Sequence, residues 1–452
     1  MTTKRPNFII FLTDDQGYGD LSCMGATDFC TPHLDSLAES GARFTNWYSN
    51  SPVCSPARAA LLTGRYPGNA GVRSILAGHR TAPGLPPKVP TIASALKQEG
   101  YKTGFSGKWH LGTVPQCQPG AHGFDNWFGH LAGCIDYFSH IFYWAMNNGP
   151  GSDPVHDVWE NGKEVWDNGK YFTEMITEKA VEMIRSSAKQ EEPFLLYIAY
   201  NAPHYPMHAP QKYLDRFPDL EPDRQIMAAM ISAVDDGVGE IMAELKRQGV
   251  ADRTCTVFTS DNGPSRESRN WLDGNDDPYY GGTTGGLKGH KFSLYDGGTK
   301  VPGIMHWPDT IPAGQVLDSP VAHMDIFPTL LQAAGVDTSH YELDGRNILP
   351  YVSEGKAPEE RTLFWEMGKQ RSVRRGPWKL VLDGNLEEGA PVKDAVHLSN
   401  VIDDPAEITN LKDDELELTK ELTELVENWY GNIKTRWLEE WKPEKQGLVT
   451  HK

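Results

Sequence analysis

Two pairs of polar residues, far apart in the sequence, offer oxygen atoms of the kind that a hard cation binds. Asp14-Asp15 and Asp261-Asn262 supply carboxylate and amide oxygens, which suit Ca²⁺, with Mg²⁺ as the alternative. A second set of side chains has the chemistry to hold a tetrahedral oxyanion. This set consists of Arg58, Lys108, His110 and His204. A cation site beside an oxyanion site indicates the hydrolysis of a charged ester.

The stretch SPVCSPARAALLTGRYP places a cysteine at the start of a predicted helix. Pro56 suits a first helical turn, because its missing N–H would have no partner there, and Gly64 marks the end of the helix. Cys54 is therefore expected at the helix N-terminus, where free backbone amides and the helix dipole favour a thiolate or a bound anion. A buried structural cysteine is the alternative interpretation.

Most of these polar groups follow a short apolar run that predicts a buried strand. The four runs are Phe8–Leu12, Lys102–Ser106, Phe194–Tyr200 and Thr254–Thr259. In a parallel sheet the carboxyl ends of the strands lie along one edge, where ligands bind, so groups distant in sequence can converge. Taken singly, each acidic pair could instead belong to a turn or a helix cap. Each histidine could instead be a hydrogen-bonded residue of the core.

Strand-like runs alternate with amphipathic helical segments over most of the chain. This pattern predicts an α/β fold with a mainly parallel central sheet flanked by helices. The predicted helices cover 32–41, 91–98, 171–188 and 224–247. Beyond residue 343, alternating strands and a helix at 414–437 predict a smaller α+β subdomain with a short antiparallel sheet. The expected division is a catalytic domain at 1–342 and a C-terminal subdomain at 343–452.

The composition excludes some classes of function. The 43 lysines and arginines against 61 aspartates and glutamates give a formal net charge of -18, which argues against a binder of nucleic acid or of an anionic membrane. No apolar run approaches the roughly 20 residues that a membrane span needs. No signal-peptide core precedes the first strand, so we expect a cytoplasmic chain, or a secreted or periplasmic one if a leader is removed. The scattered cysteines are expected to be reduced.

Two long motifs resemble the signatures of the type I, formylglycine-dependent sulfatases of the alkaline-phosphatase superfamily. The first is Cys54-Ser-Pro-Ala-Arg58, and the second is GYKTGFSGKWHLG, which begins at Gly100. The residues around both acidic pairs and the segment KFSLYDGGTKVP match the same family in order. RGPWKLV and LSNVIDDPAEITNL resemble its C-terminal part, so the arylsulfatase-like resemblance spans nearly the whole chain.

The resemblance implies that a separate maturation enzyme converts Cys54 to formylglycine. It also implies one Ca²⁺ held by the modified Cys54 together with Asp14, Asp15, Asp261 and Asn262. The hydrate of formylglycine would attack sulfur, with Asp261 as the base, and leave a covalent sulfate ester on residue 54. His110 would then deprotonate the second hydroxyl of the hydrate, so that sulfate is expelled. A serine or cysteine nucleophile cannot perform that last step.

The same resemblance gives roles to the cationic residues. Arg58, Lys108 and Lys291 would hold the sulfate oxygens, and His204 with Lys291 would protonate the leaving alcohol. Many relatives have Glu-Gly-Gly followed by Arg where this chain has Asp296-Gly-Gly-Thr-Lys300. Counting back from Asp296 selects Lys291, and a shift of register would give its role to Lys288.

Two stretches rich in glycine, aspartate and aromatic residues, 143–170 and 264–287, are predicted to be loops that select the substrate. The substrate-binding candidates are Trp144, Trp271, Arg266 and Arg269, and further aromatic candidates are Trp159, Trp166, Tyr279 and Tyr280. Their rings would stack on sugar faces, and the arginines would pair with a carboxylate or a second sulfate. The alternative is that most are loop-core aromatics and solvated charges. We expect a sulfated oligosaccharide, from glycosaminoglycan or algal polysaccharide, that loses terminal sulfates.

Two other functions fit parts of the pattern. A phosphonate or phosphate-diester hydrolase of the same superfamily typically has a histidine after the aspartate of the Ser-Asp motif. This chain has Asn262 there, whose oxygen suits Ca²⁺ better than Zn²⁺ or Mn²⁺. A non-catalytic binder of sulfated glycans would keep the pocket and leave Cys54 as a thiol, but it would need no proton donors.

Overall fold

A large sheet forms the centre of the molecule. The computed structural model describes residues 5–143, 154–190, 192–267 and 278–441. The ten strands of the central sheet are β1 (Asn7–Thr13), β2 (Ala42–Phe44), β4 (Lys102–Lys108), β5 (Asn126–His130), β8 (Trp159–Glu160), β9 (Lys163–Glu164), β10 (Phe194–Ala199), β11 (Thr254–Ser260), β12 (Gly303–His306) and β13 (Gln315–Leu317). Their order is β13-β2-β12-β11-β1-β10-β4-β5-β8-β9. The run from β11 to β5 is parallel, which confirms the predicted mainly parallel sheet.

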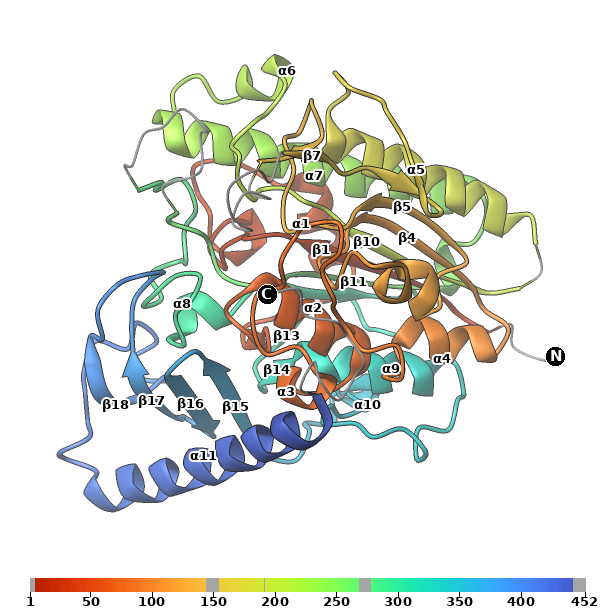
Figure 1. Ribbon diagram of the computed structural model, residues 1–452. Coiled ribbons are helices and arrows are strands. Elements are labelled where there is room, and N and C mark those ends of the chain that lie inside the picture. Colours follow the sequence, from red (N-terminus) through yellow and green to blue (C-terminus); the bar gives the residue numbers. More distant parts are fainter. Residues whose placement is uncertain (1–4, 144–153, 191, 268–277, 442–452) are drawn as a thin grey trace.

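Helices cover both faces of this sheet (Figure 1). One face carries α1 (Pro32–Glu39), α5 (Phe172–Ala188) and α7 (Pro222–Arg247), and the other carries α2 (Cys54–Thr63), α4 (Ile92–Gln98) and α9 (Ile326–Ala333). In β1, Ile9 and Phe11 join the core beneath the first group of helices, whereas Ile10 and Leu12 join the core beneath the second. Successive side chains of a strand point to opposite faces, so a continuous apolar run is buried on both sides.

A second, antiparallel sheet lies in the C-terminal part. Its strands are β15 (Thr362–Met367), β16 (Gln370–Arg375), β17 (Trp378–Gly384) and β18 (Asp394–Asn400). On one face the sheet packs against Leu422 and Val426 of α11 (Leu416–Arg436), as the blue ribbon in Figure 1 shows. On the other face Trp365 packs against Tyr48 of the main part, with ring centres 5.3 Å apart. The α+β character expected here is confirmed, and the domain boundary after residue 342 stays a prediction.

The prediction of a loop over 143–170 is partly wrong. β6 (Ile141–Phe142) pairs with β7 (Val155–His156), and β8 and β9 form a hairpin at the edge of the central sheet. Strands of two residues are too short for apolar and polar residues to show an alternation. In 264–287 the described residues form neither helix nor strand.

Several short elements connect the larger ones. They are β3 (Trp47–Tyr48), β14 (Val321–Ala322), α3 (Pro67–Ala70), α6 (Gln211–Leu214), α8 (Asp296–Thr299) and α10 (Leu349–Glu354). In the part of the chain that the structure describes, no helix combines the length and the apolar character needed to cross a membrane.

Candidate active site

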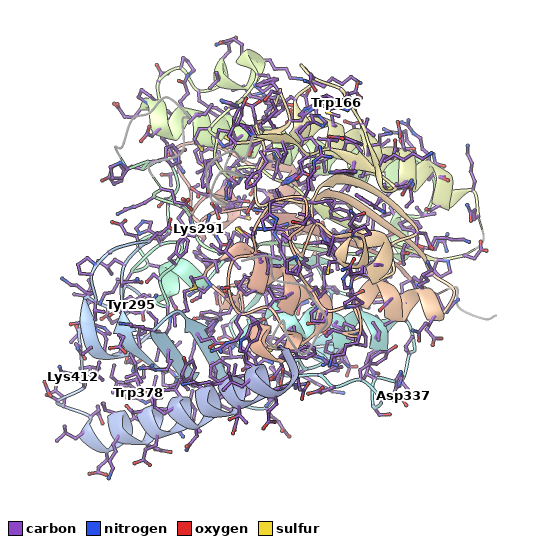
Figure 2. All side chains as sticks on the ribbon, viewed as in Figure 1. Trp166, Lys291, Tyr295, Asp337, Trp378 and Lys412 are labelled. Carbon is purple, nitrogen blue, oxygen red and sulfur yellow. The ribbon has the colours of Figure 1, made fainter. Side chains whose placement is uncertain are left out.

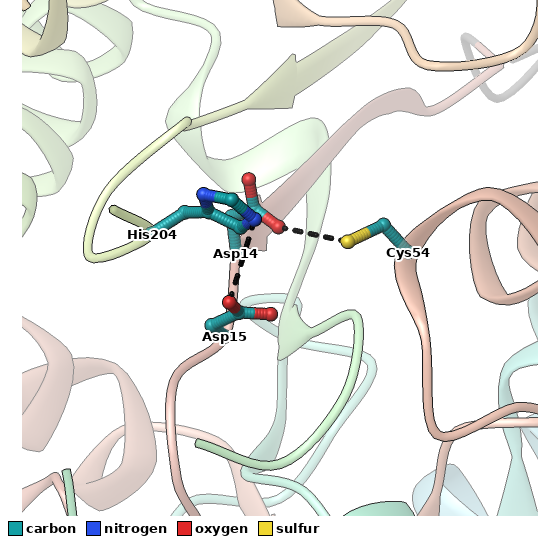
Figure 3. Close-up of side chains that lie close together, drawn as sticks. All are labelled: Asp14, Asp15, Cys54 and His204. Atoms are coloured by element: carbon teal, nitrogen blue, oxygen red, sulfur yellow. Dashed lines mark hydrogen bonds and ion pairs between the residues drawn. The ribbon is translucent and has the colours of Figure 1, made fainter. Parts of the chain in front are cut away.

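Four adjacent strands bring the predicted site residues to one edge of the central sheet. β11, β1, β10 and β4 are neighbours, and their carboxyl ends lead into the two acidic pairs, His204 and the Lys108–His110 segment. Cys54 arrives from a different element, the first turn of α2. Figure 3 shows Asp14, Asp15, Cys54 and His204 converging, and one ligand atom from each lies within 4.8 Å of the others.

Two site residues have an unusual backbone conformation. Asp15 has φ 62° and His110 has φ 52°, in the left-handed region that favours glycine. Such a conformation costs on the order of 1–3 kcal/mol unless its surroundings hold it. The backbone N of Asp15 donates to Oδ1 of Asp261 at 3.1 Å, and Nδ2 of Asn262 donates to Oδ1 of Asp15 at 2.7 Å. The two acidic pairs therefore fix each other.

Arg58 is fully buried and joins the ends of three strands. Its Nε and Nη2 donate to Oδ2 of Asp261 at 3.0 and 2.7 Å, Nη1 donates to the backbone O of Lys108 at 2.8 Å, and Nη2 lies 3.4 Å from Oδ1 of Asp14. Burial alone would raise the pKa of Asp261, but Arg58 and Lys108 outweigh it and lower this pKa to about 2. Asp261 is therefore ionised and held in place by the guanidinium.

The thiol of Cys54 is 2% exposed. Its Sγ lies 3.6 Å from Oδ1 of Asp14, and burial raises the pKa of the thiol well above its ordinary value, although Lys108 and Lys291 lower it (Figure 3). Desolvation therefore opposes the thiolate that the helix amides and the nearby cations favour at this helix N-terminus. Unmodified Cys54 is a neutral thiol, which is a weak nucleophile.

His110 has one ring nitrogen that can accept a proton. Nε2 lies 3.1 Å from the backbone O of Leu76, and because a carbonyl oxygen only accepts, Nε2 carries the hydrogen. Nδ1 is buried and has no hydrogen-bond partner within the described chain. Burial, with Lys108 and Arg58 adding to it, lowers the pKa of His110 well below its ordinary value. The ring is neutral, and Nδ1 is the atom that can take a proton.

Lys291 contacts three groups at once. Its Nζ lies 2.8 Å from Oδ2 of Asp15, 2.8 Å from Oε1 of Glu267 and 3.2 Å from Nε2 of His204. Nδ1 of His204 donates to the backbone O of Tyr205 at 2.7 Å, so Nε2 holds the lone pair that faces Lys291. Burial and Lys291 lower the pKa of His204 well below its ordinary value, whereas Asp15 and Glu267 raise that of Lys291 against the effect of burial. The proton shared by this pair is therefore on Lys291.

Lys288, the alternative to Lys291 for the catalytic role, contacts a different part of the molecule. Its Nζ donates to the backbone O of Glu407 at 3.1 Å and lies 3.8 Å from Oδ2 of Asp394, both in the C-terminal part. Lys291, labelled near the centre of the molecule in Figure 2, is 3% exposed and lines the cavity at Cys54. The count from Asp296 thus agrees with the geometry. Sequence reasoning missed Glu267, for which an acidic residue in the loop after Asn262 was the only signal.

The buried acidic residues fit a divalent cation. Four carboxylates and three cationic side chains meet here, so the formal charge of the cluster is one negative unit. The seven residues are Asp14, Asp15, Asp261, Glu267, Arg58, Lys108 and Lys291. Burial raises the pKa of Asp14 and Asp15, and Oδ1 of Asn262 is buried without a hydrogen-bond partner among the described residues. A divalent cation would give this oxygen a partner and make the cluster positive, as an anionic ligand requires.

A cavity of about 360 Å³ opens at Cys54, a size typical of small-molecule sites. His110, His204 and Lys291 line its polar end, and Glu388, from the loop between β17 and β18, lines it as well. Glu267 also lines the charged end. The remaining wall consists of the segment 75–79 together with Gly133, Cys134, Phe142, Tyr205 and Phe292. The backbone N of Leu76 donates to Oγ of Ser55 at 3.1 Å, which ties this segment to α2. The cavity therefore joins a charged end to an apolar wall.

The predicted specificity residues that the structure describes do not line this cavity. Arg266 lies over the ring of Tyr280 at 5.1 Å, and Trp166 stacks on His156 at 3.8 Å, well away from Lys291 in Figure 2. Tyr279 is buried, with its hydroxyl donating to a backbone oxygen, and Trp159 donates to a carboxylate from its indole N–H. Trp144, Trp271 and Arg269 lie outside the described residues.

Comparison with known proteins identifies the family. Residues 6–336 match the family model described as Sulfatase, and residues 289–430 match one described as N-sulphoglucosamine sulphohydrolase, C-terminal. N-acetylgalactosamine-6-sulfatase from Mus musculus is 33% identical over 397 residues, which cover 83% of this chain and 72% of the relative. Arylsulfatase A from Homo sapiens is 31% identical over 427 residues, which cover 88% and 79%.

Solved structures of other proteins also resemble this chain. Ps i-CgsB is 32% identical with a TM-score of 0.83, covering 94% of this chain and 92% of that one. A phosphonate monoester hydrolase of Agrobacterium radiobacter, 21% identical with a TM-score of 0.63 over 96% of each chain, shares the fold alone. Members of the matched family generally use a metal ion and a formylglycine. This chain therefore belongs to the sulfatase family of the alkaline-phosphatase superfamily, and it is a sulfuric ester hydrolase.

Proposed function

We propose that this sulfatase removes terminal sulfate esters from sulfated oligosaccharides, with residue 54 as the nucleophile after its conversion to formylglycine. The cavity at Cys54 carries the proposal, because it joins a charged, buried end to an apolar and aromatic wall. A wall of this kind suits the faces of a sugar ring. Two relatives support the substrate class, one named N-acetylgalactosamine-6-sulfatase and one solved in complex with k-i-k-neocarrahexaose.

Three cationic residues would hold the sulfate group, and of these three Lys291 lines the cavity directly. The charge of a sulfate ester stays on its non-bridging oxygens, and Arg58, Lys108 and Lys291 are buried cations that carboxylates already hold in place. Such preorganised groups need little rearrangement when the reaction occurs. Ca²⁺, held by Asp14, Asp15, Asp261, Asn262 and residue 54, would polarise the sulfate oxygens as a Lewis acid.

Three proton transfers fall to separate residues. A separate maturation enzyme would make formylglycine, and water adds to its aldehyde to give a hydrate. The hydrate has two hydroxyls on one carbon, one to attack sulfur and one to drive the release of sulfate. Nζ of Lys291, with His204 beside it, protonates the leaving alcohol, since the proton of this pair is on the lysine. Nδ1 of His110 accepts the proton of the second hydroxyl. Asp261 is the base that accepts the proton of the first hydroxyl, because its carboxylate keeps free lone pairs beyond its contacts with Arg58 and Asp15.

A screen of defined sulfated mono- and disaccharides for sulfate release tests this function. A phosphonate monoester and a phosphate diester belong in the same screen, because both are substrates of the nearest alternative. We expect sulfate release from at least one sugar sulfate to exceed the turnover of both phosphorus substrates. Turnover of the phosphorus substrates alone would overturn the proposal, and binding of sulfated sugars without any turnover would indicate a glycan-binding protein.

A further inference from the structure

A second cavity adjoins the one at Cys54. It measures about 270 Å³ and lies against the C-terminal sheet, between the turn that joins β15 to β16 and the loop that joins β17 to β18. Phe292 and Glu388 line both cavities, so the two hollows share a wall. A molecule seated in the first cavity can therefore extend past these two side chains into the second.

The shared wall is held rigidly. Gln370 is 4% exposed, its Nε2 donates to the backbone O of Phe292 at 2.7 Å, and its Oε1 accepts from the backbone N of Asn385 at 3.1 Å. One side chain of β16 thus fixes a residue of the first cavity and a residue of the second. Phe292 also has φ 74°, which is rare for a bulky residue and persists only where the surroundings impose it. The wall is preformed rather than shaped by a ligand.

The lining of the second cavity has the mixed chemistry of a sugar site. Phe292 and Val392, the latter 53% exposed, offer apolar surface. Lys369, Asp383 and Glu388 add charged groups to the lining, and Asn385 adds an amide, all of which can hydrogen-bond to hydroxyl groups. Sugars present C–H faces and hydroxyl edges together, which such a surface can match.

We propose that the second cavity is a subsite for the sugar residue next to the one that carries the sulfate ester. The inference rests on the proposed function, since it assumes that the sulfated sugar occupies the cavity at Cys54. It assigns the C-terminal sheet a part in binding the substrate. The enzyme should accordingly prefer a disaccharide to the monosaccharide that carries the same sulfate.

Substitution of Val392 tests the subsite without touching the catalytic groups. Val392→Glu places a larger, charged side chain in the second cavity, and Val316→Glu is the matched control, because Val316 is similarly exposed at 57% on edge strand β13. The substrates are a sulfated monosaccharide and the disaccharide that ends in the same sulfated sugar. We expect Val392→Glu to lower kcat/KM about tenfold for the disaccharide and less than about twofold for the monosaccharide. Asn385→Ala should act in the same direction, and Val316→Glu should change neither value.

The outcomes separate the subsite from the proposed function. Equal losses on both substrates, or no loss on the disaccharide, would overturn the subsite while sulfate release continued. Release from neither sugar by the wild-type chain would count against the proposed function. In that case a thermal-shift titration with the same two sugars tests the subsite. If the disaccharide raises the Tm of the wild type but not of Val392→Glu, the subsite is supported. If the Tm shifts of the wild type and of Val392→Glu are identical, the subsite is overturned.

Discussion

The ammonium of Lys291 lies 2.8 Å from the carboxylate of Glu267, and both side chains are buried. An acidic residue beside a sulfate-binding cavity would by itself repel the substrate. Its contact with Lys291 gives it a different effect, because Asp15 and Glu267 together keep the proton on Lys291 against the effect of burial. We therefore regard Glu267 as a positioning residue for the group that protonates the leaving alcohol.

Glu267→Gln tests this relationship by removing the charge and keeping the size. For a sugar sulfate we expect kcat to fall about tenfold, because Lys291 is no longer held between two carboxylates. The alkaline limb of the pH–rate profile should move to lower pH, since one negative charge that retains the proton is gone. With 4-nitrophenyl sulfate, whose leaving group needs little proton assistance, kcat should fall much less. Equal falls on both substrates with unshifted profiles would contradict this role.

Gly133 sets the position of His110. A Cβ at residue 133 would lie 2.8 Å from Cε1 and 2.9 Å from Nε2 of the His110 ring, closer than side chains approach one another. Gly133→Ala should displace the ring, break its contact with Leu76 and lower kcat about tenfold or more, with the fold retained. Gly431→Ala is the control, because a Cβ there meets no atom within 4 Å. Kinetics and far-UV circular dichroism of both variants check this, and unchanged kcat in Gly133→Ala would show that the ring needs no such space.

The oxygen ligands predict a single site for one divalent cation. We expect chelation to stop sulfate release and Ca²⁺ to restore it, and we expect Ca²⁺ to raise the Tm of the wild type but not of Asp14→Asn or Asp261→Asn. Asp28→Asn is the control, since the carboxylate of Asp28 pairs with Arg224 at 2.6 Å outside the site. Metal analysis that finds two zinc ions in the active enzyme would refute the single-site account.

Glu407 predicts a pH-dependent contribution to stability. It is fully buried, its Oε2 accepts from the backbone N of Asp296 at 2.6 Å, and burial raises its pKa from 4.5 to about 7, although Lys379 lowers it. A carboxyl group with a raised pKa in the folded chain contributes stability that is full below its unfolded pKa and is lost as the pH rises through its folded pKa. Between about pH 5 and about pH 8 the Tm of the wild type should therefore fall more than that of Glu407→Gln. Parallel curves would show that Glu407 does not titrate in this range.

The catalytic end of the site could be predicted from the sequence, whereas the substrate end could not. Asp14, Lys108 and Asp261 directly follow, or end, apolar strands of a parallel sheet, and topology alone brings such positions together. Segment 75–79 and Glu388 come from loops without periodicity, and their approach to Cys54 depends on tertiary packing. Tyr279 illustrates the same limit, because residue type does not distinguish a sugar-stacking ring from one whose hydroxyl is bonded inside a loop.

The central claim is that residue 54 acts with two oxygens on one carbon. Mass spectrometry of the peptide that contains residue 54, recorded during turnover of a sulfated substrate, tests it most directly. We expect formylglycine at this position in the active wild type. In Cys54→Ser we expect a serine that carries a sulfate ester after at most one turnover, because its single oxygen cannot expel the group. Steady multiple turnover by a chain whose residue 54 is unmodified cysteine or serine would contradict the account.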